Sequence, residues 1–189
     1  MRLVLASRND HKRLEFARLM TGYVIDPLVD EVELPPETGA TLAANALVKA
    51  QAAAEATGAA SIADDSGIEA DALGGGPGIR SARFAGENAT DAENLAKFRR
   101  EVPAGSAIAY VCALAFVDPV AKTTHVVEGR CHGTMSSDPL GQNGFGYDPI
   151  FIFNGQQDRR TMAQLSDSEK DAVSHRAEAV KDLMRWLTS

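Results

Sequence analysis

The sequence contains few of the residues that mark secreted, membrane-spanning or metal-cluster proteins. Its 189 residues include 2 cysteines and 1 tryptophan, and aromatic residues make up only 6%. Because Cys112 and Cys131 lie far apart and form no C-x-x-C pair, we expect two reduced thiols rather than a disulfide or a zinc site. No apolar run approaches the roughly 20 residues of a membrane-spanning helix, and no apolar signal-peptide segment follows Met1. These absences predict a cytoplasmic protein without a membrane partner.

Motifs of several well-known enzyme classes are absent as well. No G-x-x-x-x-G-K-[ST] segment of a P-loop occurs, and the glycine-rich stretch 74–78 lacks the lysine that such a loop needs. The 4 histidines show no H-E-x-x-H spacing, and Ser66 lacks the G-x-S-x-G pattern of a serine hydrolase. P-loop nucleotide binding, zinc peptidase chemistry and serine hydrolysis are therefore not expected.

Basic residues are in the minority. The chain has 19 Lys and Arg against 26 Asp and Glu, which gives a formal net charge of −7. A surface that follows a nucleic-acid polymer needs an excess of basic residues, so we expect no such partner. A single nucleotide remains compatible, because a few lysines and a metal ion can meet its charge locally. The length and the 44% hydrophobic content predict one domain that buries its core without disulfides.

Short apolar segments alternate with helical patterns along the chain. Asn9 and Asp10 offer an N-cap for a helix that Gly22 would end. The strongest helical pattern covers 41–57, where alanine is frequent and Gly58 follows as a stop signal. Thr90 opens one capping box, and a second one begins at 166. Later helices are expected from 91 to about 100 and from about 174 to 187, and strands at 3–6, 23–25, 61–63, 107–117 and 123–128.

The order of these elements indicates the fold class. Strands and helices alternate early, and the last two strands read as a hairpin apolar enough for the middle of a sheet. This pattern predicts an α/β fold in which helices flank a mixed β-sheet.

The segment 7–12 lies between the first predicted strand and the first predicted helix. Backbone N–H groups at the start of a helix attract phosphate. Ser7, Asn9 and Lys12 add hydroxyl, amide and ammonium donors to this turn. On its own, the segment fits an ordinary capped helix with a surface lysine better than a phosphate site.

Asp64 and Asp65 directly follow an apolar strand-like segment. α/β folds place ligands at the carboxyl ends of strands, and two adjacent carboxylates need a cation nearby if both are to be ionised. Mg²⁺ is the expected cation, since it prefers carboxylate oxygens and keeps several waters. Glu37, in the loop 35–39, is a candidate second carboxylate. A solvated turn is the alternative for the two aspartates, and an exposed acid is the alternative for Glu37.

The segment 143–149 combines flexible glycines with Phe145 and Tyr147. Exposed rings framed by glycine can stack on a nucleotide base, and each such contact contributes about 1–3 kcal/mol. A hairpin turn with buried aromatics is the competing interpretation. Lys170, His175 and Arg176 bring two cations and a histidine near the start of the last predicted helix. Arg176 has the fork geometry to donate to a base carbonyl, or it is a surface charge.

Together these segments resemble the inosine/xanthosine triphosphate pyrophosphatase family, whose members remove aberrant purine nucleotides from the nucleotide pool. Each matching motif alone is ambiguous, whereas their shared order is specific and covers nearly the whole chain. The motifs are Ser7-x-Asn9-x-x-Lys12, Glu37-Thr38-Gly39, Asn45-Ala46-x-x-Lys49-Ala50, Ala63-Asp64-Asp65-Ser66-Gly67, Leu73-Gly74-Gly75-x-Pro77-Gly78, Ser81-Ala82-Arg83, Gly144-Phe145-Gly146-Tyr147-Asp148-Pro149 and Ser174-His175-Arg176.

The resemblance implies a fold, an assembly and a reaction. Residues 1–189 would form a single elongated α/β domain in two lobes, with a central mixed sheet and the active site in the cleft between the lobes. The protein would be a homodimer that depends on Mg²⁺. It would cleave the purine nucleoside triphosphates ITP, dITP and XTP between the α- and β-phosphates, giving a nucleoside monophosphate and pyrophosphate.

The resemblance also implies a role for each matching residue. Glu37 and Asp65 would position Mg²⁺, and Asp65 would accept the proton of the attacking water. Residues implied to hold the triphosphate or touch the substrate are Ser7, Asn9, Lys12, Lys49 and Ser66. Residues implied to form the base pocket are Phe145, which would stack on the purine, with Gly146, Tyr147 and Asp148. Those implied to complete the base and phosphate contacts are Lys170, His175 and Arg176.

Two positions depart from the family's pattern. Ala44 stands where many members carry an acidic residue before the Asn-Ala pair, so one carboxylate near the metal site is missing. Asn143 replaces a glycine often seen before the Gly-Phe-Gly-Tyr-Asp segment. The alternatives are therefore a related pyrophosphatase for pyrimidine or modified nucleotides, a non-catalytic nucleotide-binding protein, and a structural or interaction domain.

Overall fold

The computed structural model describes residues 1–189, and their contacts divide the chain into two compact units. The first unit comprises Met1–Asp65, Cys112–Gly129 and Arg176–Ser189, and the second comprises Ser66–Val111 and Arg130–His175. The single domain in two lobes stays a prediction.

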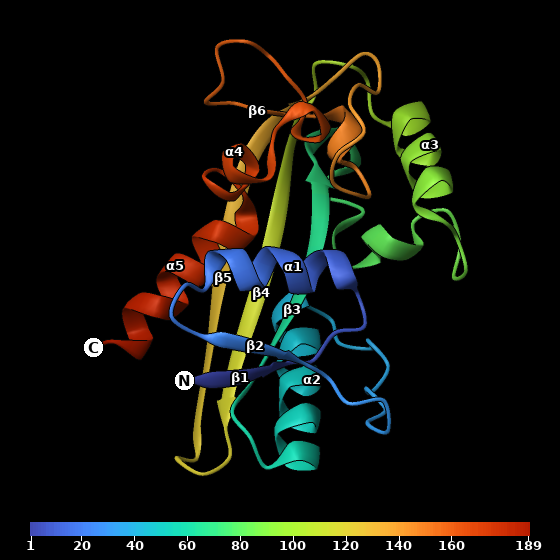
Figure 1. Cartoon of the computed structure of the whole chain (residues 1–189). Coiled ribbons are helices and arrows are strands. Elements are labelled where there is room, and N and C mark those ends of the chain that lie inside the picture. Colours follow the sequence, from blue (N-terminus) through green and yellow to red (C-terminus); the bar gives the residue numbers. More distant parts are fainter. The chain divides into compact units, whose positions relative to one another are not determined.

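Six strands form one sheet in the order β2-β1-β3-β4-β5-β6 (Figure 1). Strand β1 pairs in parallel with β2 and with β3, whereas β5 and β6 pair in antiparallel fashion. This arrangement confirms the mixed α/β sheet that the sequence predicts. The strands are β1 (Arg2–Leu5), β2 (Val24–Pro27), β3 (Ser61–Ala70), β4 (Ala107–Asp118), β5 (Thr123–Met135) and β6 (Phe151–Phe153).

The helices begin and end close to the residues that the sequence marks as caps. Thr90 and Ser166 each open a helix in a reciprocal capping box, as predicted. Gly58 ends α2 in the left-handed conformation, with a φ of 65°. Helix α1 ends at Leu19 rather than at Gly22. The helices are α1 (Asp10–Leu19), α2 (Leu42–Thr57), α3 (Asp91–Glu101), α4 (Asp167–Asp171) and α5 (His175–Leu187).

Strands β3 and β5 are longer than the sequence predicts. Strand β3 continues through both aspartates to Ala70, so the expectation that it ends at Ala63 is wrong. Two adjacent carboxylates look like a turn, but here oppositely charged side chains surround them and permit burial. Strand β5 continues past Glu128 to Met135, because every second residue from 129 to 135 stays buried.

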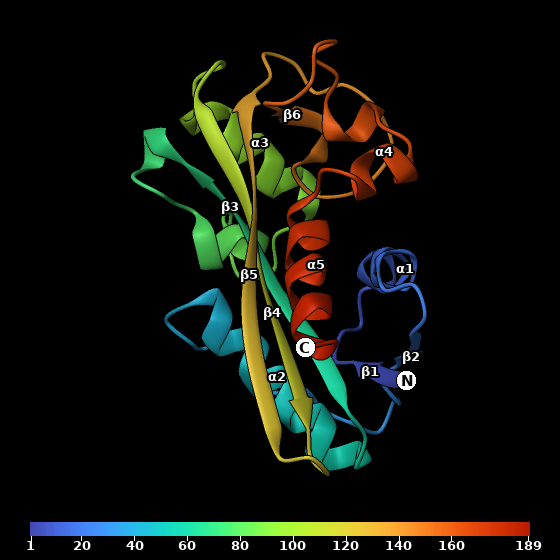
Figure 2. The same cartoon turned by 90° about the vertical axis from the view of Figure 1, so that its left-hand side faces the viewer.

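Helices cover both faces of the strands in the first unit (Figure 2). One face packs on α1 and α5 in a hydrophobic core that includes Leu3, Leu5, Phe16, Ile62, Leu114 and Leu183. The other face packs on α2 through the fully buried side chains of Ala46, Ala50, Ala53 and Ala54. The second unit has its own core, which includes Ile68, Phe98, Ile150, Phe151 and Met162. None of the helices is long and apolar enough to cross a membrane.

Candidate functional site

Asp64 and Asp65 lie inside β3, just beyond the residues that pair with β1. The register between the two strands ends with Leu5 opposite Ile62, so both aspartates extend past the carboxyl end of β1. Successive residues of a strand point to opposite faces of the sheet. Asp64 therefore faces α1 and α5, and Asp65 faces α2.

On one face, the fully buried carboxylate of Asp64 meets two cations. Its Oδ1 lies 3.0 Å from Lys12 Nζ, and its Oδ2 accepts a hydrogen bond of 3.3 Å from Arg176 Nε. The same guanidinium donates through Nη1 to Glu15 Oε2 at 2.9 Å. Arg176 is 3% exposed, so it is an internal counter-charge and its interpretation as a surface charge is wrong.

On the other face, Asp65 is held by residues of α2. Asn45 Nδ2 donates to Asp65 Oδ2 at 2.9 Å, and Lys49 Nζ lies 3.9 Å from Asp65 Oδ1. Lys49 also donates to Glu37 Oε1 and, at 2.8 Å, to the backbone carbonyl of Asp64. Asn45 and Lys49 are four positions apart on α2, and this spacing brings both side chains to the same strand.

Asn45, to which the sequence analysis assigns no role, uses both ends of its buried amide. Its Oδ1 accepts a hydrogen bond of 2.7 Å from the Gly39 N–H, while its Nδ2 donates to Asp65. A Cβ at Gly39 would lie 2.6 Å from that Oδ1, so the contact requires glycine. Asn45 therefore ties the loop that carries Glu37 to Asp65. The Asn-Ala pair of the matching motif is the sequence signal for this link.

We call these seven side chains the charged cluster. It contains four carboxylates and three cations, namely Glu15, Glu37, Asp64, Asp65, Lys12, Lys49 and Arg176. Burial opposes the charged form of Lys49, but the neighbouring carboxylates outweigh it and raise its pKa. Burial also raises the pKa of Asp65, with Lys49 opposing the rise and Glu37 adding to it. The concentration of four carboxylates and the costly ionisation of Asp65 favour the binding of a cation here.

The oxygen donors of the charged cluster fit Mg²⁺. Glu37 and Asp65 both approach Lys49, and Mg²⁺ is typically held by one or two carboxylates together with water and phosphate oxygens. No group of three or more His, Cys, Asp or Glu that could hold a metal ion occurs in residues 1–189. The donor set therefore suits a two-carboxylate Mg²⁺ site and not a zinc site with three or four protein ligands.

Lys12 is the residue of the segment 7–12 whose side chain reaches the charged cluster. Ser7 Oγ accepts the Asn9 N–H at 3.2 Å, and Asn9 Oδ1 accepts the Lys12 N–H at 3.2 Å as the N-cap of α1. Arg8 donates instead to backbone carbonyls at positions 28, 29, 30 and 32. Ser66, half-buried, follows Asp65 along β3 as the first residue of the second unit.

In the second unit, Asp148 gathers the predicted base-pocket residues. It is 3% exposed, and its Oδ2 accepts hydrogen bonds from Lys170 Nζ at 2.7 Å and from the Phe145 N–H at 3.0 Å. Lys170 Nζ also lies 5.2 Å from the centroid of the Phe145 ring, within cation–π range. The structure thus brings Phe145, Asp148 and Lys170 together.

Two glycines with positive φ shape the loop around Phe145. Gly144 has a φ of 73° and Gly146 a φ of 61°, values that favour glycine. A Cβ at Gly144 would lie 2.0 Å from Asp148 Oδ2. Gly146 donates its N–H to Asp91 Oδ2 at 3.1 Å. Both glycines therefore determine the backbone conformation of the loop.

Tyr147 belongs to the core of the second unit. Its ring packs on Phe98 at a centroid distance of 5.1 Å, and its hydroxyl donates to the Ser81 carbonyl at 2.7 Å. Burial, with Asp91 adding to the effect, raises the pKa of Tyr147, so the hydroxyl stays a donor. The expectation of two exposed aromatics is wrong for Tyr147, while Phe145 is half-buried.

His175 lies against an aromatic residue that the sequence analysis misses. Its buried ring stacks on Tyr110 of β4, with centroids 4.7 Å apart and an angle of 18° between the planes. The Tyr110 hydroxyl donates to Asp148 Oδ1 at 3.1 Å. We call Tyr110, Phe145, Asp148, Lys170 and His175 the Asp148 cluster.

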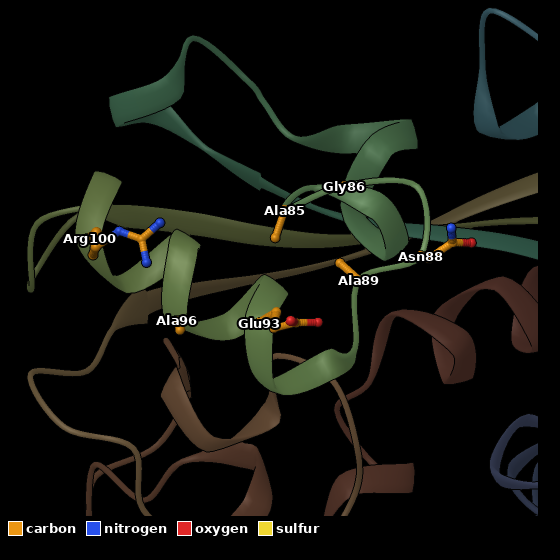
Figure 3. A pocket seen from close by; sticks show the side chains of 7 residues that line it. All are labelled: Ala85, Gly86, Asn88, Ala89, Glu93, Ala96 and Arg100. Atoms are coloured by element: carbon orange, nitrogen blue, oxygen red, sulfur yellow. The ribbon is translucent and has the colours of Figure 1, made fainter.

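A pocket of about 440 Å³ lies beside α3, and none of the residues proposed above lines it (Figure 3). It is lined by Ala85, Gly86, Asn88, Ala89, Glu93, Ala96 and Arg100. The carboxylate of Glu93 already accepts the Thr90 N–H and hydroxyl in the capping box. The other polar side chains of the lining are Asn88 and Arg100, beside four small residues.

The chain matches the model of the Ham1 family over residues 3–186. It is 44% identical over 201 positions to a dITP/XTP pyrophosphatase of Frankia alni, with 99% of this chain and 97% of that protein covered. It is 45% identical over 199 positions to a dITP/XTP pyrophosphatase of Mycobacterium tuberculosis, with 100% and 96% covered. Solved structures of a HAM1 protein from Coxiella burnetii and of the Staphylococcus aureus Ham1 protein match it with TM-scores of 0.86 and 0.84. Their identities are 36% and 37%, and the matches cover 100% of this chain and 98% of each structure.

Proposed function

Because the chain belongs to the Ham1 family, we infer that it is a nucleoside-triphosphate pyrophosphatase that hydrolyses dITP and XTP to the monophosphate and pyrophosphate. Relatives named dITP/XTP pyrophosphatase support this at 44% and 45% identity over nearly the whole chain. ITP is the third proposed substrate, since it carries the same base as dITP. The observation that carries the proposal is the charged cluster, in which lysines and carboxylates meet at the end of β1.

Hydrolysis of a polyphosphate needs little covalent chemistry from the protein. It needs negative charge stabilised on the phosphate oxygens and a water molecule held in line with the bond that breaks. Lys12 and Lys49 supply positive charge, and the backbone N–H groups at the start of α1 add neutral donors. We assign the triphosphate to this part of the first unit, with Ser7 and Asn9 shaping the turn.

Asp65 is the proposed proton acceptor for the attacking water. Its Oδ2 accepts a hydrogen bond from Asn45 Nδ2, and its Oδ1 lies 3.9 Å from Lys49 Nζ, so both neighbours orient the carboxylate. A raised pKa makes a carboxylate a better base than an ordinary aspartate. Ser66 is proposed to touch the substrate beside it.

Glu37 and Asp65 would hold Mg²⁺. When bound there, the ion would withdraw charge from phosphate oxygens and add positive charge beside the carboxylates. The absence of a carboxylate at Ala44 fits a site that draws its remaining ligands from water and substrate.

The Asp148 cluster is the proposed binding site for the purine base. Phe145 offers a ring for stacking, while Lys170 and His175 offer donors near it. A base with a 6-oxo group accepts hydrogen bonds, whereas the 6-amino group of adenine would face donors, and an unpaired buried polar group costs about 1–3 kcal/mol. Gly146 shapes the loop, and Tyr147 anchors the loop in the core of the second unit. Arg176 contacts Glu15 and Asp64. Its contact with the base or the phosphates stays a prediction.

Two further proposals concern the protein as a whole. We propose a homodimer, which the family resemblance supports. We also propose that the enzyme works in the cytoplasm, where the nucleotide pool that it would clear is located.

Pyrophosphate release from a substrate panel, with and without Mg²⁺, tests the proposed function. The panel is ITP, dITP, XTP, dTTP, UTP, ATP and GTP. We expect Mg²⁺-dependent release of pyrophosphate and monophosphate from the first three. Preference for a pyrimidine would replace the proposed substrate, tight ITP binding without turnover would indicate a non-catalytic binding protein, and no thermal shift with any nucleotide would contradict nucleotide binding.

A further inference from the structure

Tyr110 links His175 to the rest of the Asp148 cluster, because it contacts both His175 and Asp148. It lies in β4, a strand that is otherwise built almost entirely from small and aliphatic side chains. A buried tyrosine hydroxyl requires a hydrogen-bond partner, and here the partner is Asp148 Oδ1 at 3.1 Å. The ring stacks on Phe151 with centroids 4.4 Å apart and planes inclined by 17°. It also stacks on His175 at 4.7 Å and 18°.

Asp148 accepts three hydrogen bonds within the unit. One oxygen accepts from Tyr110, and the other accepts from Lys170 and from the Phe145 backbone. This carboxylate therefore fixes the positions of the groups that donate to it. Tyr110 supplies one of the three donors to Asp148, and it is also the ring against which His175 packs.

We propose that Tyr110 is a positioning residue for base selection, because it joins the stacked ring of His175 to the carboxylate that orients Phe145 and Lys170. The proposal rests on the assignment of the base to the Asp148 cluster. Loss of the hydroxyl frees the Asp148 carboxylate to rotate. The Phe145 loop and the Lys170 ammonium, which both donate to this carboxylate, are then held less firmly in place. The triphosphate contacts in the first unit need none of these groups.

Tyr110→Phe tests the proposal, because it removes the hydroxyl and keeps the ring. We expect the KM for ITP to rise about 5- to 30-fold, as for one buried hydrogen bond lost, with kcat changed far less. The ratio of kcat/KM for ITP to that for ATP should fall, because ATP carries a 6-amino group where ITP carries a 6-oxo group. Inhibition by inosine monophosphate should weaken, while inhibition by pyrophosphate should stay unchanged.

Tyr23→Phe is the matched control, since it deletes a hydroxyl from a half-buried tyrosine of the first unit. It should leave every one of these constants unchanged. A purely structural role for Tyr110 would lower the melting temperature and reduce kcat/KM for ITP and ATP by the same factor. That equal loss, or an unchanged ITP/ATP ratio in Tyr110→Phe, would overturn the proposal. Absence of pyrophosphate release by the unmodified protein would instead refute the proposed function itself, so the two failures are distinguishable.

Discussion

The two clusters bury carboxylates in different ways. In the first unit, four carboxylates face three cations, and ion pairs dominate their surroundings. In the second unit, one carboxylate meets an ammonium, a hydroxyl and a backbone N–H, and aromatic rings lie around it. The first arrangement concentrates charges of both signs, whereas the second surrounds a single carboxylate with oriented donors.

This difference suits the two ends of a nucleotide. A triphosphate with its metal ion brings charge of both signs, and a cluster of lysines and carboxylates offers a partner for each. A base is neutral and flat, and a fixed ring with oriented donors distinguishes one base from another. Substitutions in the charged cluster should therefore affect all nucleotides alike, while substitutions in the Asp148 cluster should affect selectivity.

Asp65→Asn should have the largest effect on the reaction. The amide keeps the shape of the side chain and can still accept from Asn45, but it is no base, so we expect kcat to fall about 100- to 10,000-fold for every nucleotide. Single-turnover measurement of pyrophosphate release with ITP and GTP would check this. Retention of more than about a tenth of the activity would exclude Asp65 as the proton acceptor.

The same variant should be more stable than the unmodified protein without metal. Because the pKa of Asp65 is raised in the folded protein, the unfolded chain releases this proton at a lower pH. Stability is therefore lost as the pH rises from the ordinary carboxyl pKa through the raised one. The variant lacks this loss, so it should melt at a higher temperature at neutral pH and show no advantage in acid, as thermal denaturation at several pH values would reveal.

Lys12→Gln should lower kcat/KM by about 10- to 100-fold, the effect of a lost charged hydrogen bond to phosphate. The loss should be equal for ITP, XTP and GTP. Lys181→Gln, on the exposed surface of α5, removes the same charge from a side chain that is 64% exposed and should change nothing. A loss confined to one base would contradict the assignment of Lys12 to the phosphates.

Phe145→Leu should raise the KM for ITP by about 5- to 100-fold, since one stacking contact contributes about 1–3 kcal/mol. Inhibition by inosine monophosphate should weaken in step, and inhibition by pyrophosphate provides the internal control. An unchanged KM would remove Phe145 from the base site.

Asn45→Ala should have the smallest effect on catalysis and a measurable one on stability. It leaves the Gly39 N–H and Asp65 Oδ2 without this partner, at a cost of about 1–3 kcal/mol and a fall in melting temperature of about 2–10 °C. Asn88→Ala, at an exposed position, is the matched control. Equal melting temperatures for the two variants would show that Asn45 does not tie the Glu37 loop to β3.

Local signals account for the parts of the fold that the sequence predicts. Caps mark where helices begin, and short apolar runs mark β1 and β4. The sequence-based prediction of β3 is wrong at Asp64 and Asp65, because two adjacent carboxylates are typical of a turn. Only the cations that pair with them explain why they lie inside a strand. Those partners lie on α1, α2 and α5, and no local pattern reveals them.

The residues of the candidate site also fall into those that the sequence predicts and those that it does not. Lys12, Lys49 and Asp65 stand out because their motifs match a family in order. Glu15 has no such signal, since its partner Arg176 lies 161 positions further along the chain. Tyr110 is hidden similarly, because a tyrosine in an apolar strand looks like core until Asp148, 38 positions away, is found at its hydroxyl.

The ratio of kcat/KM for ITP to kcat/KM for ATP, measured in Lys12→Gln and in Phe145→Leu, tests most directly whether the charged cluster binds phosphates and the Asp148 cluster selects the base. We expect Lys12→Gln to keep the ratio of the unmodified enzyme within about threefold, which corresponds to less than 1 kcal/mol of differential binding. Phe145→Leu should lower it beyond that limit. A collapsed ratio in Lys12→Gln together with an unchanged ratio in Phe145→Leu would contradict the account.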